Sequence, residues 1–402
     1  MASAPQSTAV SEAATRSPTA AAASGGTAGR FSARRFLVIL IVILLLGIVL
    51  IAGANYTLDP LHFSASGQRK VAAVLLSGRN YAVFDANIDF RALRRQAIAQ
   101  MTQTPDVIIF GGSRFELATA DFFPGKTYYN AFVHNDTFED LVAIAGLLYE
   151  RNRLPKNLVM TVRYKTFLPI DQKIRETDEF KLFWPEYRSM AERLRIPKEP
   201  WYEIMPFAYW SHLLSVSNIA RHASYRLQGK HQRPVDVAAM DDMDVLHADG
   251  SMSFSAEHSA SFKAILLSRG VTNMFSNAET IDEDAEQRGR KAAQLAEWPV
   301  DPKRLEALSV LLGFLKEHGT YVTIAITPHH PAYWKAIQGS PFGNSLVDME
   351  ERVRIIAAAS GAAVVGSLDP ERVGCTSDHM RDFIHPDIVC LQAVFKDIQV
   401  KS

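Results

Sequence analysis

Short apolar runs alternate with amphipathic patterns through much of this chain. The clearest run, Val107–Phe110, is too short for a helix and rich in β-formers, which is typical of a buried parallel strand. Further segments have the same apolar, aromatic or β-branched character, namely residues 127–133, 158–162, 321–326 and 362–366. The pattern therefore predicts a sheet of about five strands.

Helical patterns separate these strands. Thr137 and Asp140 have the spacing of a capping box ahead of an apolar stripe, which predicts a helix as far as about residue 152. Asp301 and Pro302 are typical of a helix start, and Gly361 of a helix end. The other predicted helical segments are residues 91–101, 305–314 and 345–360. Strand, helix and strand with short connections form a parallel crossover unit, so the predicted fold class is α/β with a mainly parallel sheet.

The amino-terminal part of the chain has a different pattern. Residues 1–30 are rich in Ala, Ser, Thr, Gly and Pro, so they are predicted to be a disordered tail. Residues 36–58 carry no charge and, at about 1.5 Å per residue, could span roughly 30 Å of hydrocarbon as a transmembrane anchor. Arg30, Arg34 and Arg35 precede this run, so the positive-inside bias places the tail in the cytoplasm and the remainder outside.

A cleaved signal peptide is the alternative for this run, because Ala52-Gly53-Ala54 has the small-x-small form of a cleavage site. We expect an uncleaved anchor, since the apolar run is longer than in a usual signal and its basic residues start late. Residues 60–402 are long enough for one large domain, in which the α/β alternation stops at about 168–297. That interruption predicts a largely helical insertion. The chain's 43 basic and 43 acidic residues balance, which argues against nucleic acid as a partner.

The candidate chemistry begins directly after the strand Val107–Phe110. Gly111 and Gly112 let the backbone turn sharply, and ligands in open α/β sheets collect beyond the carboxyl ends of the strands. Ser113 is therefore a candidate nucleophile. A serine that caps the next segment is an equal alternative from this tripeptide alone.

A second candidate group lies near the end of the chain. Asp382 and His385 are three residues apart, and Pro386 is predicted to be the first residue of the last helix, which puts His385 on the preceding loop. The aspartate could hold one imidazole nitrogen while the other takes a proton from a serine. After the strand at 321–326, His329 is expected at the rim of the site. Adjacent histidines without other ligands at zinc spacing predict no metal site, and no motif predicts a cofactor.

The two cysteines, Cys375 and Cys390, bracket the loop that carries Asp382 and His385. In an exported domain they could pair, and the bond would close a loop of about fifteen residues. The alternative is two buried small side chains that never meet, and this alternative is the one we expect.

Glycine and serine after the first strand of the sheet, with Asp-x-x-His before the last helix, resemble the SGNH/GDSL hydrolase superfamily. The resemblance covers roughly residues 60–400 and is greatest for membrane-anchored SGNH-like proteins of bacterial cell-surface polysaccharide systems, relatives of the alginate O-acetyltransferase and D-alanyl-transfer groups. It implies a three-layer α/β/α, flavodoxin-like domain. It also implies that Ser113 is the nucleophile, His385 the base and Asp382 its orienting partner.

The chain departs from the family pattern at the oxyanion hole. The family's second and third blocks supply a glycine N–H and an asparagine side chain, whereas this sequence has Tyr129-Asn130-Ala131 and Val162-Arg163-Tyr164 and no Gly-x-Asn-Asp. Losing one oxyanion donor can lower the rate about 100-fold to 1000-fold. The candidates for contacting the substrate or the oxyanion are Gly112, Arg114, Asn130, Arg163 and His329.

The resemblance implies a function in the bacterial inner membrane, with a periplasmic main domain. The expected activity is O-acetyl transfer to, or removal from, a cell-surface polysaccharide, and the expected partners are the membrane, the polysaccharide and a membrane-bound acyl donor protein. Because the oxyanion blocks differ, an inactive glycan-binding or scaffold protein of a polysaccharide export complex is the alternative.

Overall fold

The structure is a computed structural model, and it describes residues 33–58, 65–83, 88–167, 183–196, 214–228, 231–256, 258–259, 280–298 and 300–401. The predicted tail, residues 1–30, and parts of the predicted insertion at 168–297 lie outside the described residues. The chain divides into two compact units, one up to Leu50 and the other from Ile51 onward, and each is considered by itself.

The apolar segment near the amino end forms one helix, α1 (Ala33–Leu58). It begins three residues before the predicted span at 36–58 and ends at the predicted residue. Residues Ala33–Tyr56 are long and apolar enough to cross a membrane, by length and composition.

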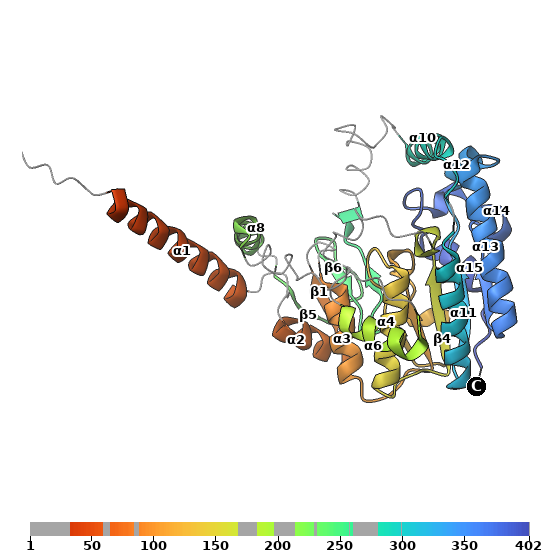
Figure 1. The fold of residues 1–402 in the computed structure, drawn as a ribbon, viewed down its shortest axis with the longest axis horizontal. Helices are drawn as coiled ribbons and strands as arrows, with labels where there is room; N and C mark the ends of the chain where they lie inside the picture. The colour runs from red at the N-terminus through yellow and green to blue at the C-terminus, as the bar shows by residue number, and fades with distance from the viewer. Residues whose placement is uncertain are drawn as a thin grey trace, which may run out of the picture. The chain divides into compact units, whose positions relative to one another are not determined.

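The remaining described elements are strands, helices and short 3-10 turns (Figure 1). The strands are β1 (Asn80–Val83), β2 (Val107–Phe110), β3 (Tyr128–Asn130), β4 (Asn157–Val162), β5 (Arg233–Val235), β6 (Asp244–Leu246), β7 (Met252–Ser253), β8 (Tyr321–Ile326) and β9 (Ala363–Gly366). The helices are α2 (Ala65–Leu76), α3 (Phe90–Gln100), α4 (Phe138–Glu150), α6 (Trp184–Leu194), α8 (Val216–Leu227), α10 (Ile281–Ala293), α11 (Pro302–Glu317), α12 (Pro331–Ile337), α13 (Pro341–Ser360), α14 (Pro370–Val373) and α15 (Ile388–Phe395). Short 3-10 turns are η1 (Ser113–Phe115), η2 (Ala120–Phe122), η3 (Tyr164–Phe167) and η6 (Ser377–His379).

The larger sheet has five strands in the order β3-β2-β4-β8-β9, and every neighbouring pair is parallel. The predicted five-stranded parallel sheet is confirmed. The chain runs outward from β2 to β3 and then returns to the other side of β2 to form β4. The direction of winding therefore reverses between β2 and β4, and the carboxyl ends of the strands at such a reversal form a crevice where ligands bind.

Strand β3 is shorter than the predicted segment 127–133. Beyond Asn130, the backbone N–H groups of Ala131 and Val133 still donate hydrogen bonds to the carbonyls of Ile109 and Gly111, at 2.7 and 2.8 Å. The chain therefore continues along the end of β2 after regular pairing stops, and it reaches the turn that carries Ser113.

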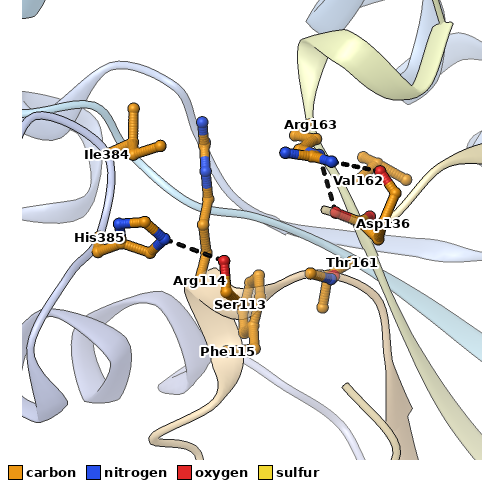
Figure 2. Close-up of a pocket in the computed structure, with 10 residues that line it drawn as sticks. Ser113, Arg114, Phe115, Asp136, Thr161, Val162, Arg163, Ile384 and His385 are labelled. Atoms are coloured by element: carbon orange, nitrogen blue, oxygen red, sulfur yellow. Dashed lines mark hydrogen bonds and ion pairs between the residues drawn. The ribbon is translucent and has the colours of Figure 1, made fainter. Parts of the chain in front are cut away.

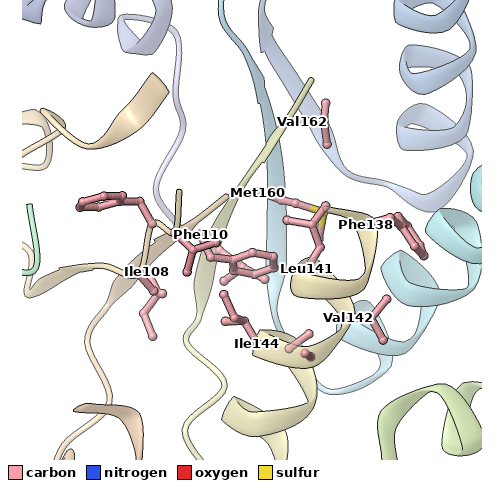
Figure 3. Packing of buried hydrophobic residues seen from close by; sticks show 14 of the residues in the cluster. Ile108, Phe110, Phe138, Leu141, Val142, Ile144, Met160 and Val162 are labelled. Carbon is pink, nitrogen blue, oxygen red and sulfur yellow. The ribbon is translucent and has the colours of Figure 1, made fainter. Parts of the chain in front are cut away.

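Each face of this sheet is covered by its own apolar cluster, because successive strand residues point to opposite sides. Ile108 and Phe110 of β2 pack into the larger cluster with Leu141 and Ile144 of α4 (Figure 3). Val107 and Ile109 belong to the other cluster, which includes Phe115, Leu391 and Val394. Burial on both faces explains why these strands are apolar at nearly every position.

The amino end of α4 has the predicted capping box. Thr137 Oγ1 accepts a hydrogen bond from the N–H of Asp140 at 3.3 Å, and Asp140 Oδ2 accepts one from the N–H of Thr137 at 3.0 Å. The same carboxylate forms a buried ion pair with Arg91 of α3 at 2.6 Å. These bonds hold the loop between β3 and α4, which contributes to the candidate site, at a fixed place.

A second, antiparallel sheet has the order β5-β1-β6-β7 and was not predicted. Its strand β1 precedes the main sheet, and β5, β6 and β7 come from the predicted insertion, for example with Asn80 opposite Val235. The described part of the predicted insertion therefore contains these three strands beside the helices α6, α8 and α10. These strands are too short to give a clear alternation in the sequence.

The last helix begins later than predicted. Asp387 caps α15 by accepting a hydrogen bond from the N–H of Cys390 at 3.0 Å, whereas Pro386 forms a bridge with Met380 ahead of the helix. The prediction that Pro386 is the first helical residue was wrong, because the aspartate after it provides the stronger cap.

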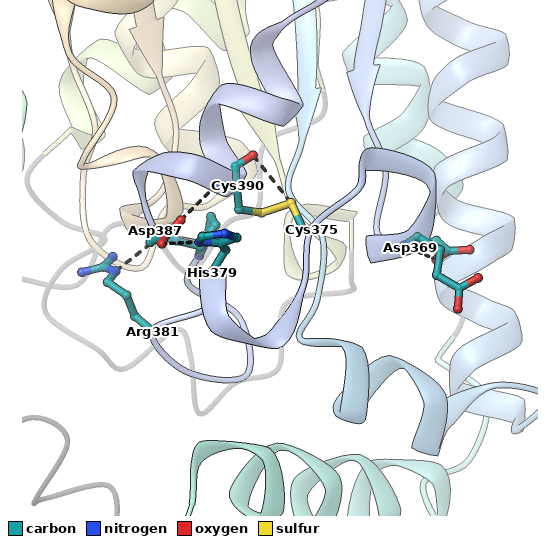
Figure 4. The surroundings of a disulfide bond; sticks show 8 residues. Asp369, Cys375, His379, Arg381, Asp387 and Cys390 are labelled. Atoms are coloured by element: carbon teal, nitrogen blue, oxygen red, sulfur yellow. Dashed lines mark hydrogen bonds and ion pairs between the residues drawn. A yellow bond between two sulfur atoms is a disulfide. The ribbon is translucent and has the colours of Figure 1, made fainter.

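Cys375 and Cys390 form a disulfide, with their Cα atoms 5.2 Å apart (Figure 4). The expectation that these cysteines stay unpaired was wrong. The loop after α14 folds back so that Cys375 meets the first turn of α15, which brackets the segment that carries Asp382 and His385.

Candidate functional site

The two glycines after β2 allow a close approach that no other residue would permit. A Cβ atom on Gly111, whose φ is +146°, would lie 1.5 Å from Thr161 Oγ1 of β4. A Cβ atom on Gly112 would lie 2.3 Å from Asp136 Oδ1. The N–H of Gly112 donates to Thr161 Oγ1 at 3.1 Å. The chain then enters the 3-10 turn η1, where Ser113 is the first residue.

Ser113, His385 and Asp382 form one chain of hydrogen bonds. Ser113 Oγ lies 3.0 Å from His385 Nε2 (Figure 2), and His385 Nδ1 lies 2.7 Å from Asp382 Oδ2. The other carboxylate oxygen of Asp382 accepts hydrogen bonds from the backbone N–H groups of Ile384 and His385, each at 2.7 Å. The structure thus brings together side chains from two loops that are far apart in the sequence, one with Ser113 and the other with Asp382 and His385.

The charge on Asp382 follows from these contacts. Burial raises the pKa of Asp382, but the imidazole of His385 and the hydrogen bonds from His385 and Ile384 lower it by more, so its net pKa lies well below the ordinary value. Asp382 is therefore ionised at neutral pH, and it accepts a hydrogen bond from the protonated Nδ1 of His385. That tautomer leaves the lone pair of His385 Nε2 facing the Ser113 hydroxyl.

A pocket of about 280 Å³, which includes solvent at its opening, lies beside Ser113 (Figure 2). Its lining residues are Gly112, Ser113, Arg114, Phe115, Asp136, Thr161, Val162, Arg163, Ile384 and His385. They come from the ends of β2 and β4, the loop after β3 and the last loop of the chain, so the pocket lies at the reversal in the strand order.

Asp136 and Thr161 were not singled out in the sequence. Asp136 Oδ1 forms an ion pair with Arg163 Nε at 2.8 Å, and Arg163 also donates to the backbone carbonyl of Asp136. Burial raises the pKa of Asp136, and the charge of Arg163 offsets part of that rise. A signal was present for both residues, since Asp136 lies in the polar run 134–137 just before α4 and Thr161 is a hydroxyl residue inside an apolar strand.

Two of the predicted oxyanion donors are used elsewhere. Asn130 is fully buried, and its amide Nδ2 donates to the carbonyls of Phe115 and Ala118 at 2.8 and 3.0 Å. The N–H of Gly112 donates its hydrogen bond to Thr161 Oγ1. Asn130 therefore holds the segment after Ser113 in place. The N–H groups of Ser113 and Arg114 start the 3-10 turn, and the described residues offer them no acceptor.

His329 had been expected at the rim of the site, but it does not lie there. Its side chain is fully buried, and its ring lies 5.0 Å from Tyr333 and is stacked 6.2 Å from Trp334, measured between centroids. Burial lowers the pKa of His329 well below its usual value, and the charge of Arg114 lowers it further. His329 is therefore a neutral ring behind the pocket, because aromatic packing has drawn it into the core.

Glu116 and Arg381 form a contact that the sequence did not reveal. Glu116 Oε1 lies 2.7 Å from Arg381 Nη2, and Glu116 Oε2 lies 3.2 Å from His134 Nε2. The backbone N–H of Arg381 donates to the carbonyl of His385 at 2.8 Å. The buried carboxylate, three residues after Ser113, thus binds the loop that carries the other two members of the hydrogen-bonded chain.

Among the described residues, no group of three or more His, Cys, Asp or Glu side chains is arranged to hold a metal ion. No model of a known protein family matches this sequence, and no curated protein matches it.

Proposed function

We propose that this chain is a membrane-anchored acyl-ester enzyme of SGNH type, with Ser113 as nucleophile, His385 as base and Asp382 as its orienting partner. The observation that carries the proposal is the hydrogen-bonded chain from Ser113 Oγ through His385 to Asp382, at 3.0 and 2.7 Å. A nucleophile within reach of a base that a third group orients is the arrangement that nucleophilic catalysis requires.

The reaction would take two steps. Ser113 Oγ bonds to the acyl carbon of an ester while its proton passes to His385 Nε2, and the leaving alcohol then takes that proton. A sugar hydroxyl or water next gives its proton to Nε2 while its oxygen bonds to the acyl carbon. The bond from that carbon to Ser113 Oγ then breaks, and Nε2 returns the proton to Oγ, which restores the serine hydroxyl and the neutral imidazole. The backbone N–H groups of Ser113 and Arg114 are the available donors for the oxyanion.

The fold supports the SGNH assignment. The strand order β3-β2-β4-β8-β9 is the order of a flavodoxin-like sheet, and apolar clusters on both faces fit a three-layer α/β/α domain. Helix α1 would anchor the enzyme in a bacterial inner membrane, with its domain in the periplasm. The substrate would then be a cell-surface polysaccharide that gains or loses O-acetyl groups, with a membrane-bound protein as acyl donor.

The second candidate is a catalytically inactive glycan-binding or scaffold protein. The observation that favours it is the use of the Gly112 N–H and the Asn130 amide within the protein, which removes two donors from the oxyanion site. Loss of oxyanion donors slows acyl transfer, whereas glycan binding does not depend on them.

Hydrolysis of 4-nitrophenyl acetate by the full chain in detergent distinguishes the two candidates. We expect Ser113→Ala and His385→Ala each to lower kcat/KM by about a hundredfold or more, because each removes a group that takes part in the proton transfer. Ser77→Ala and His318→Ala, at exposed positions, are the matched controls. Equal activity in all five proteins would remove the enzyme proposal, and glycan binding without turnover would favour the scaffold.

A further inference from the structure

Arg114, the residue after the candidate nucleophile, is a buried cation. Its relative exposure is 5%, and its one hydrogen bond within the described residues runs from Nη1 to the neutral hydroxyl of Thr327 at 3.2 Å. No carboxylate of the described residues forms an ion pair with it. A buried charge is costly unless an opposite charge and hydrogen bonds compensate for it, so an anion bound in the pocket would stabilise Arg114.

The carboxylates of Asp136 and Asp382, which lie near Arg114, already have other partners. Asp136 is paired with Arg163 at 2.8 Å, and both carboxylate oxygens of Asp382 accept hydrogen bonds within its own loop. His329, whose pKa is lowered by burial and by the charge of Arg114, is a neutral ring. The neighbourhood of Arg114 therefore contains no free negative group among the described residues.

The unpartnered part of Arg114 has a definite geometry. Nη1 is bonded to Thr327, whereas Nε is buried without an acceptor and Nη2 has none among the described residues. The Nε and Nη2 edge of a guanidinium is planar and can receive both oxygens of a carboxylate in parallel hydrogen bonds. In Figure 2 the Arg114 side chain extends from the Ser113 turn between His385 and Arg163, and the pocket is lined by all four residues.

We infer that Arg114 binds a carboxylate of the substrate, so that the enzyme acts on an ester or hydroxyl close to a negatively charged group. The name substrate here rests on the proposed acyl-ester function, whereas carboxylate binding by Arg114 does not. The carboxylate could belong to an acidic sugar of the acceptor or to the acyl group of the donor. The recognition chemistry is the same in both cases.

Calorimetric titration of the full chain in detergent, with Ser113→Ala to prevent turnover, tests this inference. The probes are two pairs that differ in a carboxylate: glucuronate with glucose for an acidic acceptor, and monomethyl succinate with methyl propionate for an acidic acyl group. We expect the charged member of at least one pair to bind about tenfold or more tightly than its neutral partner, since a charge-assisted hydrogen bond has that strength. The pair that shows the preference identifies the source of the carboxylate.

Adding Arg114→Gln should abolish that preference, and adding Arg372→Gln at an exposed ion pair should preserve it. If Arg114→Gln does not fold by circular dichroism, Arg114→Lys keeps the charge and should weaken the preference because the planar edge is lost. Equal binding of charged and neutral probes in both pairs, or a preference that survives both Arg114 variants, would overturn the inference. Carboxylate binding without ester hydrolysis in the otherwise unchanged chain would contradict the enzyme and leave the anion site standing.

Discussion

Glu116 connects the turn that carries Ser113 with the loop that carries His385. Glu116 is 4% exposed, and its carboxylate contacts Arg381 at 2.7 Å. The backbone N–H of Arg381 in turn donates a hydrogen bond to the carbonyl of His385. Burial raises the pKa of Glu116, but His134 and Arg381 lower it by more, so the residue stays ionised at neutral pH. Glu116 touches no reacting atom, and its role would be to position the base relative to the nucleophile.

Glu116→Gln keeps the shape of the side chain and removes its charge. We expect kcat for 4-nitrophenyl acetate to fall by roughly tenfold to a hundredfold with little change in KM, because a small displacement of the base slows proton transfer. Removing this negative charge near His385 should also move the acid limb of the pH–rate profile to lower pH. Glu306→Gln, at an exposed position, is the control. A lower yield of folded protein with an unmoved pH profile would indicate a structural role only.

The sequence predicted those site residues whose position follows from a neighbouring strand or helix. Ser113 follows an unmistakable buried strand, and Asp382 and His385 lie on the loop before the last helix. Glu116 and Asn130 could not be assigned, because their roles depend on partners such as Arg381 and Phe115 that only the folded chain brings near. A polar side chain in the sequence does not reveal whether its donors face the site or the core.

At the scale of elements, the turn after β2 is fixed by its contact with β4. Thr161 Oγ1 accepts a hydrogen bond from the N–H of Gly112, and the same hydroxyl occupies the space where a side chain of residue 111 would lie. The strands of the main sheet were predictable because burial on both faces makes them continuously apolar, and β8 has the predicted bounds. Strands β5 to β7 were not predictable, since three residues or fewer give no period and their pairing with β1 is distant in sequence.

Gly111→Ala should lower the free energy of unfolding by about 2–5 kcal/mol, because the new Cβ would overlap the Thr161 hydroxyl and the backbone would be strained. Activity should fall with it, since the Ser113 turn must move. Gly313→Ala is the control, because Gly313 lies inside α11 with nothing within 4 Å of its Cβ position. We expect that control to be neutral or to stabilise by about 0.5–1 kcal/mol. Urea unfolding of both variants measures the difference, and equal stabilities would refute the proposed packing of the turn.

At the scale of the whole chain, the disulfide and the apolar helix both fit the proposed periplasmic location of the main domain. Disulfides persist in oxidising compartments such as the periplasm, and Cys375–Cys390 lies after the apolar helix α1. Both features fit the proposed topology, in which the chain crosses an inner membrane once and the loop that carries Asp382 and His385 lies outside. The sequence left the pairing open because two cysteines fifteen residues apart can meet only if the loop folds back.

Replacing both cysteines, Cys375→Ser with Cys390→Ser, should lower the free energy of unfolding by about 3 kcal/mol, as loop closure in the unfolded chain is lost. At low temperature the variant should keep most of its ester hydrolysis, because the Asp382 hydrogen bonds and the Glu116–Arg381 contact also hold the loop. Urea unfolding, with the wild type under dithiothreitol as the matched comparison, measures the first effect. Thiol alkylation in acid-quenched cells tests the pairing itself, and a wild type that reacts fully with the reagent would contradict both the bond and the periplasmic placement.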